Sequence, residues 1–223
     1  MEIGGIKISY LGHSGFLIHN EKKIAIDPYN ISEAAAAEKV DLILITHSHY
    51  DHCSIKDIQK LARKGTIVVV PADAQSKITH VEEVEMQIIE VGDELAFGDV
   101  KVSAVPAYNV GKEFHPKSEG WMGYIIKMGN VVIYHSGDSD KIPEISKLSG
   151  YGKDGNKFVA LLPVSGTYVM TAEEAAEIAS VISPTVAIPM HYGAGVAGTI
   201  EDAQRFVKLC MQTGLKAEIL DKI

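Results

Sequence analysis

Cysteine is scarce in this chain, which has two in 223 residues, Cys53 and Cys210. Two thiols are too few for the disulfide framework of a small secreted protein. Long apolar stretches are also missing, because no run approaches the roughly 20 residues that a transmembrane helix needs. The first residues lack the basic flank and apolar core of a signal peptide, so a cytoplasmic location is expected.

Runs of basic residues are missing as well. The chain has 21 lysines and arginines against 29 acidic residues, which gives a formal net charge of −8. Proteins that bind nucleic acid or anionic membranes generally carry a basic patch, so we expect neither as a partner. A small-molecule substrate is expected instead. Self-association stays open, because no residue marks an interface.

The composition is that of a folded domain. Hydrophobic residues make up 46% of the chain and charged residues 22%, which supplies enough apolar material for a sizeable core. We find no linker, low-complexity tract or short repeat. Layered α/β folds often reach this length as one unit, so residues 1–223 are predicted to form a single domain.

Strand patterns dominate the first third of the chain, with a helical turn expected near 34–37. The predicted strands span residues 6–10, 15–18, 23–26, 41–46 and 66–70. Residues 41–46 form a short apolar run, which is typical of a strand buried on both faces. Residues 54–64 have one apolar stripe, since Ile55, Ile58 and Leu61 follow at intervals of three, and this predicts a helix.

The second half repeats this outline. Strands are predicted at 100–105, 158–162, 185–189 and 217–220, with a hairpin of 124–127 and 130–134. A helix is predicted at 171–182, where Thr171 and Glu174 form a capping box, and another at 201–213. Two sheets with helices on their outer faces would bury these elements.

One segment carries most of the chemical information. Thr46-His-Ser-His-Tyr-Asp-His-Cys53 follows a predicted buried strand and holds His47, His49, Asp51 and His52 within six positions. Neutral imidazole and carboxylate are ligands that suit zinc, and also manganese or iron. Because four adjacent ligands rarely reach one ion, we expect His47 and His49 to serve one metal. Asp51 and His52 would then serve a second.

This segment resembles the His-x-His-x-Asp-His signature of the metallo-β-lactamase superfamily of metal-dependent hydrolases. Three further motifs of the superfamily have counterparts in the expected order, one before this segment and two after it. They are Ile26-Asp27-Pro28, Ser136-Gly-Asp138 and Pro189-Met-His191. Within the superfamily, Leu11-Gly-His-Ser-Gly15 and Pro189-Met-His-Tyr192 are most similar to the group containing L-ascorbate-6-phosphate lactonase. The phosphodiesterase that cleaves N-acyl phosphatidylethanolamine has similar features.

The resemblance implies a fold, a cofactor and a ligand set. The fold is α/β, an αββα four-layer sandwich. The cofactor is a pair of divalent ions, zinc in the first place, with manganese and iron as alternatives. His47, His49 and one mid-chain histidine would hold the first ion. Asp51, His52 and His191 would hold the second, and Asp138 would bridge both.

The mid-chain histidine is the position where the chain departs from the family pattern. The family pattern expects histidine in a Pro-Ala-x-His context, and Asn109 occupies that place here. We predict that His115, six residues later, takes over the ligand role. The alternative leaves the first ion with His47, His49 and Asp138, and makes His115 an exposed loop residue.

Three residues are predicted to act in catalysis. Asp51 would orient the attacking hydroxide and accept its proton, and His135 or His13 would protonate the leaving group. A packed strand-end residue is the alternative for His135, and a plain turn residue for His13. Asp27 is expected to orient the metal loop by hydrogen bonds rather than to bind metal.

Together these features predict a metal-dependent hydrolase in which a hydroxide bridging two ions cleaves an ester, a lactone or a phosphodiester. A small anionic substrate is favoured, with Lys117 as its local cationic contact. The alternatives are a mononuclear or non-catalytic metal-binding protein and a nuclease-like phosphodiesterase. The net charge of −8 counts against the nuclease.

Overall fold

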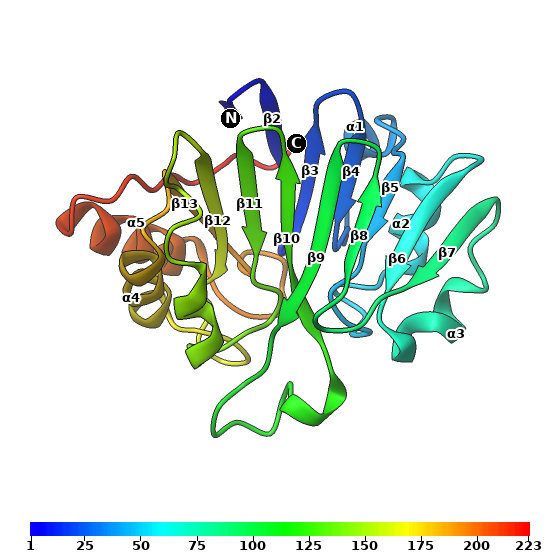
Figure 1. The fold of residues 1–223 in the computed structure, drawn as a ribbon. Coiled ribbons are helices and arrows are strands. Elements are labelled where there is room, and N and C mark those ends of the chain that lie inside the picture. Colours follow the sequence, from blue (N-terminus) through cyan, green and yellow to red (C-terminus); the bar gives the residue numbers. More distant parts are fainter. The chain divides into compact units, whose positions relative to one another are not determined.

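The computed structural model describes every residue from Met1 to Ile223, and the chain divides into two compact units. Unit 1 comprises Met1–Glu90 and Leu220–Ile223, and unit 2 comprises Val91–Ile219. Each unit is built on one mixed sheet, with seven strands in unit 1 and six in unit 2 (Figure 1). That residues 1–223 act as one domain stays a prediction.

Unit 1 has its strands in sequence order, β1 to β7. The pairings from β1 to β4 are antiparallel, and those from β4 to β7 are parallel. The strands are β1 (Glu2–Ile3), β2 (Ile6–Gly12), β3 (Gly15–His19), β4 (Lys23–Ile26), β5 (Leu42–Leu44), β6 (Thr66–Val70) and β7 (Val84–Ile88). The helices are α1 (Glu33–Ala36), α2 (Ile55–Leu61) and α3 (Gln75–Ile78), with a 3-10 turn at Ala72–Ala74.

The core of unit 1 forms where these helices meet the sheet. Ala35 of α1, Ile58 of α2 and Ile78 of α3 belong to one buried cluster with strand residues such as Ile43 and Val68. β5 is buried along its whole length, as its apolar sequence predicts. Burial of these side chains fixes the strand from which the predicted metal loop departs.

Unit 2 has the strand order β13-β12-β11-β10-β9-β8. β11, β12 and β13 are parallel, whereas β8 to β11 pair antiparallel. The strands are β8 (Glu94–Phe97), β9 (Val100–Pro106), β10 (Met122–Met128), β11 (Val131–His135), β12 (Lys157–Pro163) and β13 (Val186–Met190). The helices are α4 (Ala172–Ile182) and α5 (Ile200–Gln212), with 3-10 helices at Lys117–Glu119 and Pro143–Leu148.

Helices α4 and α5 lie beside β12 and β13 (Figure 1). α4 begins at the predicted capping box, in which Thr171 accepts from the Glu174 amide while the Glu174 carboxylate accepts from the Thr171 amide. Phe206 and Cys210 of α5 are fully buried. None of the helices has the length and apolar character needed to span a bilayer.

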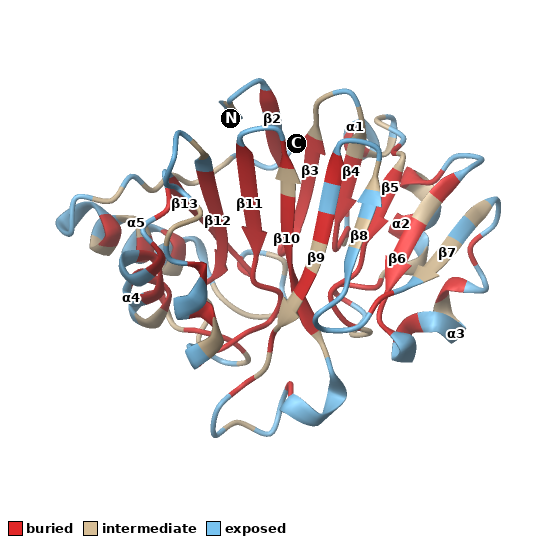
Figure 2. Cartoon of the chain, viewed as in Figure 1, coloured by how far each residue is buried: buried red, intermediate tan, exposed pale blue.

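Most predicted elements are confirmed, and the errors lie at the sheet edges. The strand predicted at 217–220 is wrong, because Ala217 and Lys222 form isolated bridges to Ala187 and Tyr10 instead. β7 and β8 were not predicted. Both are edge strands of intermediate to exposed residues (Figure 2), so their apolar signal is weak.

The strand directions bring the predicted site residues to one edge of each sheet. In unit 1, β2, β4 and β5 run in the same direction, and His13, Asp27 and His47 follow their carboxyl ends. In unit 2, β9, β11, β12 and β13 share a direction. The residues that follow these ends are Asn109, Asp138, Ser165 and His191. Sheet topology therefore gathers residues that are far apart in sequence.

Candidate metal centre

The metal loop of unit 1 is anchored at its first residue by Asp27. The Asp27 carboxylate accepts from the Thr46 amide at 2.9 Å and from the Thr46 hydroxyl at 2.6 Å. The Asp27 side chain is completely buried, so these bonds satisfy a carboxylate that would otherwise be costly to bury. The prediction that Asp27 orients the loop by hydrogen bonds is confirmed.

The same carboxylate sets the orientation of two imidazoles. His52 Nδ1 lies 2.8 Å from Asp27 Oδ2, so Nδ1 carries the proton and donates it. The Thr46 hydroxyl, which donates to Asp27, accepts from His47 Nδ1 at 2.9 Å. Both rings are thus held in the tautomer whose Nε2 is unprotonated, which is the form that binds a metal.

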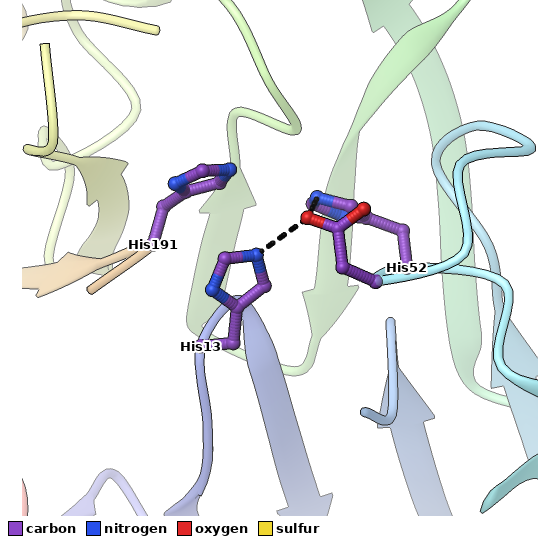
Figure 3. Close-up of side chains that lie close together, drawn as sticks. His13, His52 and His191 are labelled. Atoms are coloured by element: carbon purple, nitrogen blue, oxygen red, sulfur yellow. Dashed lines mark hydrogen bonds and ion pairs between the residues drawn. The ribbon is translucent and has the colours of Figure 1, made fainter. Parts of the chain in front are cut away.

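His13 and Asp51 form a second pair in unit 1. His13 Nε2 donates to Asp51 Oδ2 at 2.8 Å, and the ring of His52 lies beside them (Figure 3). His13, Asp51 and His52 each offer a ligand atom within 4.8 Å of the others, and all three are buried. The hydrogen bond from His13 therefore orients the Asp51 carboxylate.

His47 and His49 form the other ligand pair of the loop. Nε2 of His47 lies 3.2 Å from Nδ1 of His49, and the ring centroids are 4.8 Å apart. Two imidazole nitrogens this close can share one ion, as the sequence predicts. Unit 1 therefore holds five candidate ligands, which we call the unit 1 cluster: His13, His47, His49, Asp51 and His52.

Unit 2 holds a triad centred on Asp138. Nε2 of His115 lies 3.3 Å and Nε2 of His191 lies 3.1 Å from the same oxygen, Asp138 Oδ2. All three side chains are buried. We call His115, Asp138 and His191 the unit 2 triad. Two imidazoles converging on one carboxylate is an arrangement well suited to a metal-ligand group.

Ser165 positions His191. Its hydroxyl lies 2.9 Å from His191 Nδ1, on the side of the ring away from Asp138. Ser165 belongs to the connection between β12 and α4. Its bond to His191 had no sequence signal, because 26 positions separate the two residues.

Loss of this bond has a testable consequence. We expect Ser165→Ala to weaken metal binding about tenfold, because partners of the second imidazole nitrogen typically contribute that much. A metal titration monitored by calorimetry would measure it. Ser180→Ala is the matched control, since that hydroxyl donates within α4 to the Ala176 carbonyl. Equal affinities for the two variants would contradict a positioning role for Ser165.

Asn109 lies next to His115. Its backbone amide donates to the His115 carbonyl at 2.8 Å, and its side-chain nitrogen lies 3.2 Å from His115 Nδ1. The side-chain nitrogen of Asn109 also donates to the Tyr168 carbonyl. The geometry thus favours His115 as the residue that reaches Asp138, with Asn109 supporting its ring.

The backbone is strained where the site residues lie. Nine non-glycine residues have positive φ, and four of them are His13 (55°), Asp27 (41°), His115 (55°) and His191 (61°). This left-handed conformation is uncommon for residues with a Cβ atom and concentrates at functional sites. Four separate loops thus adopt an unfavourable conformation to present these side chains.

Other candidate residues have defined surroundings. His135 is fully buried at the end of β11, and its Nδ1 accepts from the Gly137 amide at 3.1 Å, which shapes the turn before Asp138. Its role as a proton donor stays a prediction. Cys53 is buried, and this burial raises the pKa of its thiol to about 11, so the thiol stays protonated at neutral pH. Lys117 is paired with Glu144 at 2.9 Å.

The donor set fits a metal. Every candidate ligand offers an imidazole nitrogen or a carboxylate oxygen, and the Asp27 network fixes His47 and His52 as the tautomers with unprotonated Nε2. These are the donors that zinc, manganese and iron share. The geometry defines the protein as one with a buried metal-binding cluster of histidine and aspartate on an α/β fold of two sheets.

Comparison with known proteins places this class in a family. The family described as Beta-lactamase superfamily domain matches residues 7–191. A UPF0173 metal-dependent hydrolase of Thermococcus kodakarensis is 34% identical over 223 residues, covering 96% of this chain and 95% of its own. Another, of Pelotomaculum thermopropionicum, is 33% identical over 199 residues, covering 84% of each chain. The chain therefore belongs to the β-lactamase superfamily, as a metal-dependent hydrolase.

Solved structures agree on the fold. The crystal structure of a putative metal-dependent hydrolase from Parabacteroides distasonis is 27% identical and has a TM-score of 0.81, covering 97% of this chain and 94% of its own. Igni18, a metallo hydrolase of Ignicoccus hospitalis, is 22% identical with a TM-score of 0.77 and covers 97% and 95%. The predicted fold class, the αββα sandwich of the metallo-β-lactamase type, is confirmed.

Proposed function

We propose that the unit 1 cluster and the unit 2 triad together supply the ligands of a dinuclear centre in one domain. His47, His49 and His115 hold one ion, Asp51, His52 and His191 hold the other, and Asp138 binds both. Zinc is the proposed metal, with manganese and iron as alternatives. The observation that carries the proposal is the orientation of His47, His52 and His191, whose Nδ1 atoms contact Thr46, Asp27 and Ser165 while their Nε2 atoms face other ligand candidates.

The proposed reaction is hydrolysis of an ester, a lactone or a phosphodiester in a small molecule. Two divalent ions, when bound, supply a nucleophilic hydroxide at neutral pH and polarise the substrate oxygen. Asp51 orients the nucleophile, and His13 fixes Asp51 through the 2.8 Å bond. His13 and His135 are the proposed donors of a proton to the leaving group.

The proposed binding partner is a small-molecule substrate, and neither nucleic acid nor a membrane is proposed as a partner. Measurement of the molar mass in solution would test self-association. An anionic substrate was expected to meet Lys117. That ammonium group already donates to Glu144 and lies 4.5 Å from the centroid of the Tyr108 ring. Lys117 is therefore a weaker anion contact than the sequence suggests.

Elemental analysis tests the ligand assignment. We expect about two metal ions per wild-type chain and about one in His115→Ala, because His115 completes one of the two ion sites. Asn109→Ala should keep about two. Loss of metal in Asn109→Ala but not in His115→Ala would reverse the roles of these residues.

Turnover separates an enzyme from a metal-binding protein. A panel of 4-nitrophenyl acetate, γ-butyrolactone and bis(4-nitrophenyl) phosphate covers the three proposed bond types. Hydrolysis of at least one, lost on chelation and restored by metal, is the expected result. Full metal occupancy with no turnover of any of them would favour the non-catalytic alternative.

A further inference from the structure

Large aromatic side chains lie exposed within the ligand segments themselves. Tyr50, between His49 and Asp51 in the sequence, is 63% exposed. Phe114, directly before His115, is 47% exposed. Single exposed apolar residues are common on proteins. Here, however, the two exposed rings are direct sequence neighbours of metal-ligand candidates, so they place apolar surface beside residues that would bind a ligand.

The aromatic residues of unit 2 are connected to His115 by a ring contact and hydrogen bonds. The Phe114 ring packs edge-on against Tyr168, with centroids 4.7 Å apart and an angle of 82°. The Tyr168 carbonyl accepts from the Asn109 amide, which also contacts His115. Val110, 59% exposed, belongs to the same loop. We call Val110, Phe114 and Tyr168 the apolar wall of unit 2.

Unit 1 has a comparable arrangement. Tyr50 packs edge-on against Tyr29 at 5.8 Å, and Tyr29 packs against the His13 ring at 5.7 Å. Edge-to-face contacts of this kind orient rings without covering their faces. Tyr29 and Tyr50 are the aromatic pair of unit 1. Unit 1 thus holds aromatic surface against a ligand candidate, His13, and the apolar wall of unit 2 is linked to His115 through Asn109.

The cations of the loop that carries the apolar wall are already neutralised. Lys112 donates to Asp140 at 2.5 Å, and Lys117 donates to Glu144. The hydrogen bond from Lys117 lowers the pKa of Glu144 to about 2, so the partner stays ionised at neutral pH. Glu113 and Glu119 on the same loop are exposed. A negatively charged group would meet no free cation of the loop here, whereas a neutral apolar group would meet the wall.

We infer that the apolar wall of unit 2 and the aromatic pair of unit 1 are each binding surfaces for uncharged alkyl or aryl parts of the substrate. The inference rests on the proposed hydrolase function and specifies its substrate class as apolar esters or lactones. Phe114, Tyr168 and Tyr50 are then specificity-determining residues. They bury the substrate's hydrocarbon and take no part in the chemistry.

Hydroxamic acids test this without requiring turnover. The hydroxamate group chelates the metal, and the alkyl chain probes the wall. Calorimetry on zinc-loaded protein should give hexanohydroxamate about tenfold tighter binding than acetohydroxamate, since four added methylenes would be partly buried. In Phe114→Ala and Tyr50→Ala we expect the ratio of the two affinities to fall to about threefold each, and in the double variant to about one.

Met211→Ala is the matched control, because Met211 is a 66% exposed apolar residue of α5. It should keep the wild-type ratio. A ratio near one in the wild type, or an unchanged ratio in the double variant, would overturn the inference, as would failure of both compounds to bind. A full ratio without hydrolysis of any ester or lactone would instead refute the proposed function and leave the apolar wall established.

Discussion

Replacement of Asp138 by alanine should strip the protein of metal and lower kcat/KM by about a thousandfold or more. Asp138 is buried, and the Nε2 atoms of His115 and His191 both lie within 3.3 Å of one of its oxygens. Removing the carboxylate takes away the charge around which both imidazoles are arranged. Elemental analysis and ester turnover of the purified variant measure the two effects.

The isosteric variant distinguishes a ligand from a structural residue. Asp138→Asn keeps the size and shape of the side chain but removes its charge. If Asp138 binds metal, we expect Asn to lose metal nearly as completely as Ala does, while circular dichroism of both variants stays that of the wild type. Unchanged metal content in Asp138→Asn and in Asp138→Ala would remove Asp138 from the metal centre.

Replacement of Asp27 by alanine should lower both stability and metal affinity. The fully buried Asp27 accepts hydrogen bonds from Thr46 and His52, and their loss would leave buried donors unsatisfied. We expect the free energy of unfolding to fall by about 3 kcal/mol. Metal affinity should fall about 10- to 100-fold, because His47 and His52 lose their fixed tautomers.

Asp57→Ala is the control that separates the two effects. Asp57 is also buried in unit 1, but its carboxylate accepts from the Asn30 amide at 2.8 Å and the Ser54 hydroxyl at 2.7 Å. A comparable loss of stability with less than about threefold loss of metal affinity is expected. Equal losses of metal affinity in Asp27→Ala and Asp57→Ala would mean that Asp27 acts through loop stability alone.

Local sequence patterns were sufficient for most of the fold. β4, β6 and the capped helix α4 lie where their apolar runs and caps predict, because these signals depend on neighbours within a few residues. The prediction of a strand at 217–220 was wrong because strand pairing depends on distant residues. Its apolar residues suit a strand, but Ala217 pairs with Ala187 in a single isolated bridge. Pairing depends on a distant partner that the local pattern does not contain.

The candidate site shows the same division. Residues 46–53 alone predict the types of the candidate ligands, their order and the loop that follows β5. This is possible because residues that bind one metal often lie a few positions apart in the sequence. The loop itself also contains Tyr50, whose exposure the sequence does not reveal. Thr46 directly precedes His47, so its role in holding that ring had a weak local signal.

By itself, then, the sequence determined the superfamily through the resemblance of its motifs, and it determined the types of the candidate ligands and the elements that carry them through local composition and spacing. The tertiary structure alone decided which partners hold those ligands. Asp27 reaches His52 across 25 positions, Ser165 reaches His191 across 26, and His115 rather than Asn109 approaches Asp138. These contacts arise because parallel strands end at a common sheet edge, and strand pairing is a long-range property of the folded chain.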